Sequence, residues 1–479
     1  MDTYKNLING EWRGSVETTP NVNPSDLSDI IGHYTKASVE DTKDAIAAAK
    51  NAFNDWSMVS PEQRSDILDR AGNEIIARKE ELGQLLSREE GKTLAEGIGE
   101  SVRAGRIFKF FAGEAVRVTG DSIASVRPGV QVTIDREPLG VVGIISPWNF
   151  PIAIPAWKIA PALAYGNCVV FKPADLVPGC GWAIADILQR SGIPAGVFNL
   201  VMGRGRTVGE EILNNKDVTA ISFTGSVGVG HHVATTAVAR MAKVQTEMGG
   251  KNPLVILNDA DLDKAVECAV NGAYFSTGQR CTASSRLIVE SGIHDKFVDA
   301  MKARLDTLVI GDALDTGTHI GPVVSESQLQ QNLNYIEIGK SEGASLVYGG
   351  EKLEISGKDG FYMQPALFTN TTNDMRINKE EIFGPVATII KAQNYEDALQ
   401  ISNDTEFGLA AGICTSSLKY ASDFKRRAEA GMVMVNLPTA GVDYHVPFGG
   451  RKGSSYGARE QGRYAMEFYT TVKTSYVSS

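Results

Sequence analysis

The chain has 479 residues, enough for two or three folding units of roughly 100–200 residues each and for a large core. Hydrophobic residues make up 43% and charged residues 22%, the balance of an ordinary soluble globular protein. The formal net charge of -10 argues against nucleic acid or an anionic membrane surface as the main partner, because an acidic surface repels both.

Cysteine and histidine usage argues against a metal site and against a disulfide framework. No CxxC pair occurs, and the six histidines do not cluster with the cysteines. Because the cysteines are odd in number and widely spaced, we expect reduced thiols, a cytoplasmic protein and no structural metal. The five cysteines are Cys168, Cys180, Cys268, Cys281 and Cys414.

The N-terminal segment MDTYKNLINGEWRG is not typical of a targeting segment. It lacks the apolar run of a secretory signal and the Arg/Ser bias of a transit peptide. No stretch of the chain approaches the roughly 20 apolar residues that a membrane span needs. We therefore expect no membrane partner.

Residues 39–110 predict long amphipathic helices. Ser60-Pro61-Glu62 is typical of a helix start, because proline is tolerated in the first turn. Apolar residues recur at helical spacing on both sides of this start. They are Ala45, Ala48, Ala49, Ala52 and Phe53, then Ile67, Leu68, Ala71, Ile75 and Ile76.

From residue 141 the pattern changes to short apolar runs separated by helical segments. Such alternation predicts a doubly wound, mostly parallel α/β sheet, whose ligands bind at the carboxyl ends of the strands. Each run ends in Gly, Pro, Ser, Thr or Lys. The runs are 141–145, 168–171, 198–201 and 220–223.

A second α/β pattern follows Gly249-Gly250, with strand candidates at 253–257, 286–289 and 432–435. Two further stretches, 131–134 and 469–472, alternate as exposed strands do. Their edges need cover, which a neighbouring subunit would supply. We expect one unit from 1–116 with 139–248, a second from 249–464, and an oligomerisation element from 117–138 with 465–479.

Cys281 lies in the segment STGQRCTA, where small residues leave room for a substrate. The thiolate is the reactive form of cysteine, and a nearby cation lowers its pKa. Arg280 is adjacent and is the candidate cation. A buried structural cysteine is the competing interpretation, because cysteines are often buried.

Glu247 and Asn149 are candidates for a base and an oxyanion donor. Glu247 precedes Gly249-Gly250, a turn that allows close approach to a ligand, and a partly desolvated carboxylate there can act as a general base. Asn149 lies in PWNFP, a loop fixed by two prolines, and its amide can donate to a developing oxyanion. The competing interpretations are a solvated glutamate and a turn asparagine.

Four further segments carry weaker signals. The segment 225–230, GSVGVG, follows a strand and opens a helix, as a pyrophosphate site does, but it is not a full GxGxxG motif. Lys172 and Asp175 follow a strand and can hold ribose hydroxyls. The segments 380–385, EEIFGP, and 447–452, PFGGRK, are aromatic turns that loop packing alone would also explain.

Together these segments resemble the aldehyde dehydrogenase superfamily over nearly the whole chain. The match rests on PWNFP, KPA, FTGS, EMGGK, GQRC, EEIFGP and PFGG, which occur in the family's order. The resemblance implies an aldehyde dehydrogenase fold with a Rossmann-like cofactor domain (1–116 and 139–248), a catalytic domain (249–464) and a small β oligomerisation element. It further implies a homodimer or homotetramer.

The resemblance also implies a mechanism and a cofactor site. Cys281 would attack the aldehyde, Asn149 and the Cys281 N–H would hold the oxyanion, and Glu247 would activate water to hydrolyse the thioester. Lys158 would belong to a proton relay. The residues implied around NAD or NADP are Ile145, Ser146, Pro147, Trp148, Lys172, Ala174, Asp175, Gly205, Phe223, Gly225, Ser226, Val229, Met248, Gly249, Glu381 and Phe383.

Two features qualify the resemblance. The segment 454–460 is one residue longer than the family pattern, which leaves open whether Glu460 joins Lys158 in the relay. Asp175 stands where members that prefer NADP often carry a small hydroxyl residue. A carboxylate there would repel a 2′-phosphate, so we expect NAD to be preferred and NADP to remain possible.

The substrate is predicted to be a short acidic semialdehyde. Arginines typical of succinic semialdehyde enzymes are absent at Trp157 and Phe275, whereas Arg280 beside the nucleophile can clamp a carboxylate. GQRCTA with the segment 438–457 resembles enzymes that oxidise 2-oxoglutarate semialdehyde (2,5-dioxopentanoate). The expected aldehyde channel comprises Phe150, Ile154, Trp157, Arg280, Thr282 and Phe448.

Three alternatives stay open at this point. An enzyme of broad specificity would share the chemistry but not the substrate. A CoA-acylating enzyme would release the thioester to CoA, and such enzymes often lack the base that Glu247 provides. A non-catalytic structural relative would tend to lose Cys281 or Glu247, and both are present.

Overall fold

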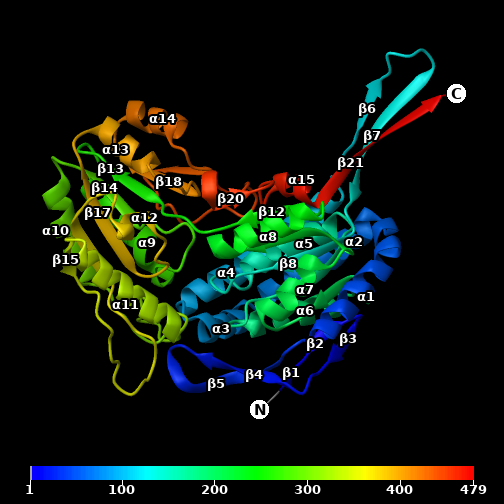
Figure 1. The fold of residues 1–479 in the computed structure, drawn as a ribbon, viewed down its shortest axis with the longest axis horizontal. Coiled ribbons are helices and arrows are strands. Elements are labelled where there is room, and N and C mark those ends of the chain that lie inside the picture. The colour runs from blue at the N-terminus through cyan, green and yellow to red at the C-terminus, as the bar shows by residue number, and fades with distance from the viewer. Residues whose placement is uncertain (1–2, 479) are drawn as a thin grey trace.

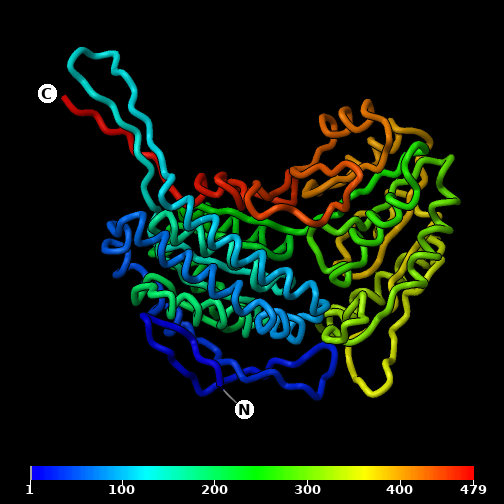
Figure 2. The backbone as a smooth tube through the Cα atoms, turned by 180° about the vertical axis from the view of Figure 1, so that it is seen from behind, coloured from blue at the N-terminus to red at the C-terminus, as the bar shows by residue number. Residues whose placement is uncertain are grey.

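Two α/β lobes and a projecting three-stranded arm make up the computed structural model, which describes residues 3–478 (Figure 1). The N-terminal strands run along the outside of the first lobe, and the C-terminal strand lies in the arm. The same arrangement is visible from behind in Figure 2. No described helix combines the length and the hydropathy that a membrane span needs.

The first lobe is built on an eight-stranded sheet in the order β20-β12-β11-β8-β9-β10-β2-β3. Its five central strands are parallel, and the chain steps outward from β8 to β10 before returning to β11 on the other side. The carboxyl ends of β8 and β11 therefore form a topological switch point, where such sheets bind ligands. The strands are β2 (Asn6–Ile8), β3 (Glu11–Arg13), β8 (Val141–Ile145), β9 (Cys168–Lys172), β10 (Phe198–Leu200), β11 (Val218–Thr224), β12 (Lys243–Glu247) and β20 (Ser455–Tyr456).

Helices cover this sheet as the periodicity of the sequence predicts. Ser60 caps α2 and Pro61 occupies its first position, while Thr93 and Glu96 form a capping box at the start of α4. Every residue of α5 is buried. The helices are α1 (Val39–Met58), α2 (Pro61–Ala77), α3 (Lys79–Glu90), α4 (Leu94–Ala115), α5 (Ala153–Ala164), α6 (Pro178–Arg190), α7 (Glu210–Asn214) and α8 (Val227–Ala239).

The second lobe contains a seven-stranded sheet in the order β15-β16-β17-β14-β13-β18-β19. All pairings are parallel except that of β15 with β16. Fully buried runs such as β13, with no exposed face, are typical of parallel sheets covered on both sides. The strands are β13 (Pro253–Ile256), β14 (Arg286–Glu290), β15 (Ser345–Tyr348), β16 (Ala366–Thr371), β17 (Val386–Ala392), β18 (Ala410–Cys414) and β19 (Met432–Val435).

Helices α9 to α14 lie in the second lobe, and α15 lies at the base of the arm (Figure 1). Asp261 caps α9, the helix that leads directly into the loop carrying Cys281. The helices are α9 (Leu262–Tyr274), α10 (His294–Leu305), α11 (Glu326–Ser341), α12 (Arg376–Lys379), α13 (Tyr395–Asn403), α14 (Leu418–Arg427) and α15 (Met466–Tyr469).

The arm is a three-stranded antiparallel sheet in the order β21-β7-β6 that projects from the first lobe (Figures 1 and 2). The alternating stretches at 131–134 and 469–472 fall in β7 and β21, although Tyr469 still belongs to α15. A separate sheet, β1-β5-β4, lies near the N-terminus. The strands are β1 (Thr3–Tyr4), β4 (Thr18–Asn23), β5 (Asp26–Thr35), β6 (Asp121–Ala124), β7 (Val130–Pro138) and β21 (Thr470–Ser478).

The predicted fold class is confirmed, and the predicted strand runs become β8 to β11, β13, β14 and β19. One strand crosses the domain bounds that the sequence predicts. β20 pairs antiparallel with β12, so Ser455 and Tyr456 join the first sheet although they lie within 249–464. A late segment of the chain thereby returns to the end of β12, next to Glu247.

Candidate active site

A cavity of about 220 Å³ opens at the switch point of the first sheet and reaches Cys281. Its walls come from the loops after β8, β11 and β12, from the loop that carries Cys281, and from α11 with the segment 381–383. Eleven predicted site residues line it: Pro147, Trp148, Asn149, Ile154, Gly225, Ser226, Met248, Gly249, Cys281, Glu381 and Phe383.

The loop before Cys281 has an unusual backbone. Ser276, Thr277 and Gly278 have consecutive φ values of 50°, 57° and 64°, in the left-handed region that costs energy for residues with a Cβ. A Cβ at Gly278 would lie 2.3 Å from the Gly384 carbonyl oxygen, so only glycine fits there. The loop places Cys281 half-buried at the wall of the cavity.

The Cys281 thiol is less acidic than the sequence predicts. Burial, followed by the carboxylates of Glu381 and Glu247, raises the pKa of Cys281 to about 12. The low pKa expected from the adjacent Arg280 is not found, because burial, followed by Glu381 and Glu247, dominates the pKa of Cys281. Near neutral pH, the thiolate can therefore form only if a base takes the proton from Cys281 or if the charge in the site changes.

Arg280 faces Glu96 rather than the cavity. Its Nη2 donates to Glu96 Oε1 at 3.1 Å, and its Nη1 donates to the Asn271 carbonyl oxygen at 3.3 Å. Glu96 Oε1 also accepts from the backbone N–H and the hydroxyl of Ser276, each at 2.8 Å. Arg280 and Glu96 thus hold the Cys281 loop together, which corrects the expectation that Arg280 binds the substrate.

Asn149 is placed to donate a hydrogen bond beside the thiol. It is 3% exposed, and its Nδ2 donates to the Gln279 carbonyl oxygen at 3.0 Å. An amide nitrogen carries two hydrogens, so one remains for an oxyanion in the cavity. The Asn149 carbonyl oxygen accepts from Lys92 Nζ at 2.7 Å, which fixes the loop from the other side.

Glu247 ends β12 in a buried position, 2% exposed. Ser455 of β20 donates from its hydroxyl to Glu247 Oε2. Burial, and next the carboxylate of Glu460, hold the pKa of Glu247 well above its usual range. A carboxylate with a raised pKa is a stronger base when ionised, as general-base catalysis requires.

Lys158 and Glu460 form a buried ion pair behind Glu247. Lys158 Nζ contacts Glu460 Oε1 and donates to the Ser222 hydroxyl oxygen at 2.9 Å. The longer segment 454–460 therefore still brings Glu460 to Lys158, because Glu460 pairs backbone to backbone with Phe448. The structure joins the two side chains whose association the sequence left open.

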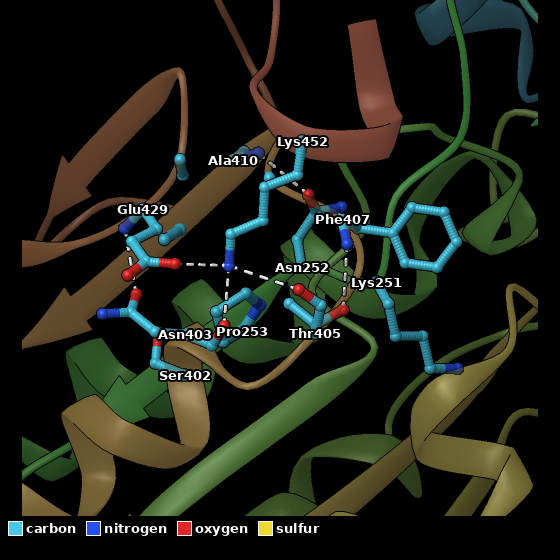
Figure 3. A pocket seen from close by; sticks show the side chains of 13 residues that line it. Lys251, Asn252, Pro253, Ser402, Asn403, Thr405, Phe407, Ala410, Glu429 and Lys452 are labelled. Carbon is cyan, nitrogen blue, oxygen red and sulfur yellow. Dashed lines mark hydrogen bonds and ion pairs between the residues drawn. The ribbon is translucent and has the colours of Figure 1, made fainter.

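The Cys281 carbonyl is held by Asn252, whose Nδ2 donates to it at 2.8 Å. Asn252 also borders a small cavity of about 10 Å³ (Figure 3). There Lys452 pairs with Glu429 at 2.6 Å and donates to the Asn403 carbonyl oxygen at 2.7 Å. The lysine of the PFGGRK segment thus has a structural role, anchoring the turn that precedes β20.

Known proteins are similar to this chain both in sequence and in fold. The sequence profile described as "Aldehyde dehydrogenase family" matches residues 12–475. The chain is 46% identical to an alpha-ketoglutaric semialdehyde dehydrogenase of Bacillus subtilis, covering 100% of this chain and 98% of the relative. It is 42% identical to an alpha-ketoglutarate semialdehyde dehydrogenase of Haloferax volcanii, covering 100% and 99%.

The crystal structure of a betaine aldehyde dehydrogenase from Staphylococcus aureus in complex with NAD+ superposes with a TM-score of 0.96. That protein is 34% identical, and the match covers 99% of this chain and 94% of the other. The chain belongs to the aldehyde dehydrogenase family. The resemblance inferred from the ordered motifs is thereby confirmed, and the protein is an oxidoreductase.

The cofactor side of this aldehyde dehydrogenase has polar groups that suit a dinucleotide. The hydroxyls of Ser146 and Thr224 are buried without a partner among the described residues. Ser226 precedes α8 without capping it, so the N–H groups of the first turn are available to an anion. A Cβ at Gly228 would meet nothing within 4 Å. These residues fit the pyrophosphate and ribose groups of NAD.

Glu381 and Phe383 enclose the inner end of this cleft. Glu381 Oε1 accepts from the Gly250 N–H at 3.0 Å, and burial raises the pKa of Glu381 to about 7. A Cβ at Gly249 would lie 2.0 Å from the Glu381 carboxylate, so the glycine permits their approach. Phe383 meets Trp148 edge to face, with ring centroids 5.3 Å apart.

The other predicted cofactor residues lie around the same strand ends. Lys172, the last residue of β9, forms an ion pair of 2.8 Å with Asp175. Ala174 and Asp175 line a second cavity, of about 350 Å³. Ile145 ends β8, Ser146 follows it, Gly205 begins a π-helical turn (Gly205–Gly209), Phe223 lies in β11 and Val229 lies in the first turn of α8.

The predicted aldehyde-side residues form an aromatic layer beside Cys281. Phe448 belongs to an apolar cluster that contacts Cys281, and its ring stacks on Trp157 with centroids 5.4 Å apart. Lys92 Nζ lies 3.7 Å from the centroid of the Phe150 ring. The Thr282 carbonyl oxygen accepts from the Thr439 hydroxyl at 2.6 Å, so this backbone supports the loop.

Several residues around the site were missed in the sequence. Gln328 and Gln331 of α11 line the cavity and donate to carbonyl oxygens of the segment 382–383. Their spacing of three places both on one helix face, a signal that could have been noticed. Glu96 and Ser455 carried no such signal, because each reaches the site from a distant segment.

Proposed function

We propose that this aldehyde dehydrogenase oxidises 2-oxoglutarate semialdehyde to 2-oxoglutarate, with NAD as the preferred hydride acceptor. The observation that carries the chemistry is the position of Cys281, which lines the same cavity as Asn149 and Glu381. The substrate is supported by full-length similarity to two relatives that bear the name of this semialdehyde dehydrogenase.

The residues divide the reaction into two halves. The Cys281 thiolate adds to the aldehyde carbon, and the new oxyanion accepts hydrogen bonds from the free N–H of Asn149 and the backbone N–H of Cys281. Bound NAD supplies the acceptor for the hydride of the thiohemiacetal. The resulting thioester on Cys281 is then attacked by water, which gives up a proton to Glu247 as the carbon–sulfur bond breaks.

Lys158 and Glu460 complete this arrangement as a buried polar path behind the base. The Glu460 carboxylate influences Glu247 directly, and its Oε2 is buried without a partner among the described residues. Such a group can accept a proton through a bridging water. We propose that Glu247 returns its proton toward Glu460, whose carboxylate Lys158 holds in place, between turnovers.

The NAD preference rests on Asp175. Its carboxylate pairs with Lys172 at 2.8 Å, so the positive charge of Lys172 is already neutralised. A carboxylate accepts a hydrogen bond from a free 2′-hydroxyl and repels a phosphate. The betaine aldehyde dehydrogenase to which the chain is similar was crystallised with NAD+.

The arm suits assembly into a homodimer or homotetramer. Val472, Tyr476 and Val477 of β21 are more than half exposed, and β21 is an edge strand with unpaired backbone groups. Exposed apolar edges of this kind are covered in native proteins, and a second copy of the chain would cover them.

A panel of aldehydes with NAD or NADP tests the proposed function. We expect the highest kcat/KM for 2-oxoglutarate semialdehyde with NAD, and turnover without added CoA. Betaine aldehyde is the informative competing substrate. It is cationic, and a structurally similar protein is called a betaine aldehyde dehydrogenase. A preference for betaine aldehyde or for uncharged aldehydes would contradict the proposed substrate, and a CoA requirement would contradict hydrolysis by Glu247.

A further inference from the structure

Several side-chain donors near Cys281 are buried and have no acceptor among residues 3–478, and they include Nε2 of Gln279 and Nε of Arg280 in the Cys281 loop itself. Three others lie outside this loop. They are Nε of Arg103, Nε1 of Trp157 and Nε2 of Gln461. Buried polar groups are rarely left unpaired unless a ligand or a water satisfies them. Three donors that lack acceptors in one place therefore indicate a site for a group that only accepts.

The three side chains form one cluster, although they come from three separate segments. Arg103 of α4 donates from Nη2 to Gln461 Oε1 at 3.2 Å. Its Cζ lies 5.7 Å from the centroid of the Trp157 ring, on α5. The backbone of Gln461 is in the left-handed region, with φ of 60°. We call these three residues the donor cluster.

The donor cluster lies one aromatic layer away from the nucleophile. Phe448 belongs to the apolar cluster against which Cys281 packs, and its ring stacks on Trp157 with centroids 5.4 Å apart. Trp157 in turn lies under Arg103. Glu460, which precedes Gln461, pairs with Phe448 through its backbone. The aromatic layer of Phe448 and Trp157 thus connects the surroundings of Cys281 with the donor cluster.

Arg103 differs from three other basic side chains near Cys281, each of which has a carboxylate partner. Lys92 pairs with Glu100 at 2.8 Å, Lys158 contacts Glu460, and Arg280 pairs with Glu96 at 3.1 Å. Arg103 has no carboxylate oxygen within ion-pair distance among the described residues and bonds to a neutral amide instead.

The charge of Arg103 is therefore not neutralised by a direct partner. The nearby Glu100 carboxylate is already used by Lys92 and by the backbone N–H groups of Ile152 and Ala153. Burial lowers the pKa of Arg103, and Glu100, Asp443 and Cys281 raise it in turn, which places the guanidinium within electrostatic reach of the thiol. A guanidinium stays protonated in proteins, so the positive charge persists.

We propose that the donor cluster binds the carboxylate at the far end of an acidic aldehyde, with Arg103 as its charge partner. A carboxylate has only acceptor sites and matches the planar fork of an arginine. The Trp157 and Gln461 N–H groups complete its hydrogen bonds. The inference rests on the proposed function in that the substrate is acidic, but it does not depend on a particular chain length.

The test compares Arg103→Gln with the native enzyme on 2-oxoglutarate semialdehyde and on pentanal, an uncharged aldehyde of similar length. We expect kcat/KM for the acidic aldehyde to fall by about 10- to 100-fold, mainly through KM, because a charged hydrogen-bonded pair is lost. The value for pentanal should stay within about twofold. Arg103→Lys should restore part of the loss, since it keeps the charge but not the fork.

Two matched arginines serve as controls. Arg106 is exposed and lies about one turn further along α4, so Arg106→Gln should leave both substrates unchanged. Arg280→Gln should lower the turnover of both aldehydes by the same factor, because Arg280 supports the Cys281 loop. Equal losses for both aldehydes in Arg103→Gln would overturn the proposal and assign Arg103 a structural role.

Glutarate, a five-carbon dicarboxylate, gives a readout that does not need a semialdehyde. It should inhibit pentanal oxidation competitively with the aldehyde in the native enzyme and at least about tenfold more weakly in Arg103→Lys or Arg103→Gln. If the native enzyme prefers another acidic aldehyde, the proposed substrate fails while the donor cluster stands on that aldehyde. Absence of both glutarate inhibition and a preference for acidic aldehydes overturns the donor cluster itself.

Discussion

The two sides of Cys281 are built from different kinds of structure. On the cofactor side, the cavity is lined by loops that follow β8, β11 and β12, three neighbouring strands of one parallel sheet. On the aldehyde side, the residues come from α4, α5 and two late segments around 448 and 461. The positions of the cofactor-side residues follow from the topology of the sheet. The positions of the aldehyde-side residues depend on how helices and loops pack.

The two arginines near the thiol show what this difference means. Arg280 is adjacent to Cys281 in the chain, yet it faces Glu96 and stabilises the loop. Arg103 is far away in the chain, yet it stacks near Trp157 and lacks a carboxylate partner among the described residues. Proximity in sequence thus misleads on the aldehyde side, whereas on the cofactor side motif order and strand order lead to the same residues.

Among the effects that bear on this comparison, the largest concerns the Cys281 thiol and tests whether nearby carboxylates or arginines dominate its pKa. Because the Cys281 pKa is about 12, the thiolate fraction should rise about tenfold per pH unit well below that value. Alkylation of Cys281 by iodoacetamide, without nucleotide, should therefore accelerate about 100-fold between about pH 7 and about pH 9.

Cys281→Ser provides the baseline for this measurement, because the other four cysteines are buried. A rate that levels off below about pH 8 would show a thiol of low pKa. That result would restore a cation such as Arg280 as the dominant influence and would remove the contrast between the two sides.

A smaller effect separates the cofactor side from the aldehyde side. Asp175→Ser removes the carboxylate and frees Lys172 for a 2′-phosphate. The ratio of kcat/KM with NADP to that with NAD should rise about tenfold, because one charge repulsion disappears and one charged hydrogen bond becomes available. The ratio of acidic to neutral aldehyde oxidation should not move.

Arg103→Gln should show the opposite pattern, with changed aldehyde selectivity and unchanged cofactor selectivity. If Asp175→Ser alters the aldehyde ratio as strongly as the cofactor ratio, the two sides are coupled and the separation described above is wrong.

Much of the fold and half of the site could be predicted from the sequence. Apolar runs that end in Gly, Pro or Ser located β8 to β11, and Ser60-Pro61 located the start of α2. The ordered motifs pointed to Asn149, Glu247 and Cys281 as catalytic candidates, and Asn149 and Cys281 line the cavity.

Long-range contacts could not be predicted. Ser455 reaches Glu247 only because β20 returns to the edge of β12, and Glu96 reaches Ser276 only because α4 passes the Cys281 loop. The direction of the Cys281 pKa was also out of reach, since burial and the Glu381 carboxylate outweigh the adjacent arginine. Neither burial nor spatial charge can be read from neighbours in the chain.

The most direct test of the account is a single-turnover measurement on Glu247→Gln with NAD and 2-oxoglutarate semialdehyde. If Cys281 forms the thioester and Glu247 activates water, NADH should appear in a burst of about one equivalent per active site, followed by turnover slowed about 10²- to 10⁴-fold. Mass spectrometry should then find the acyl group on Cys281. Full steady-state turnover, or an acyl group on another residue, would contradict the account.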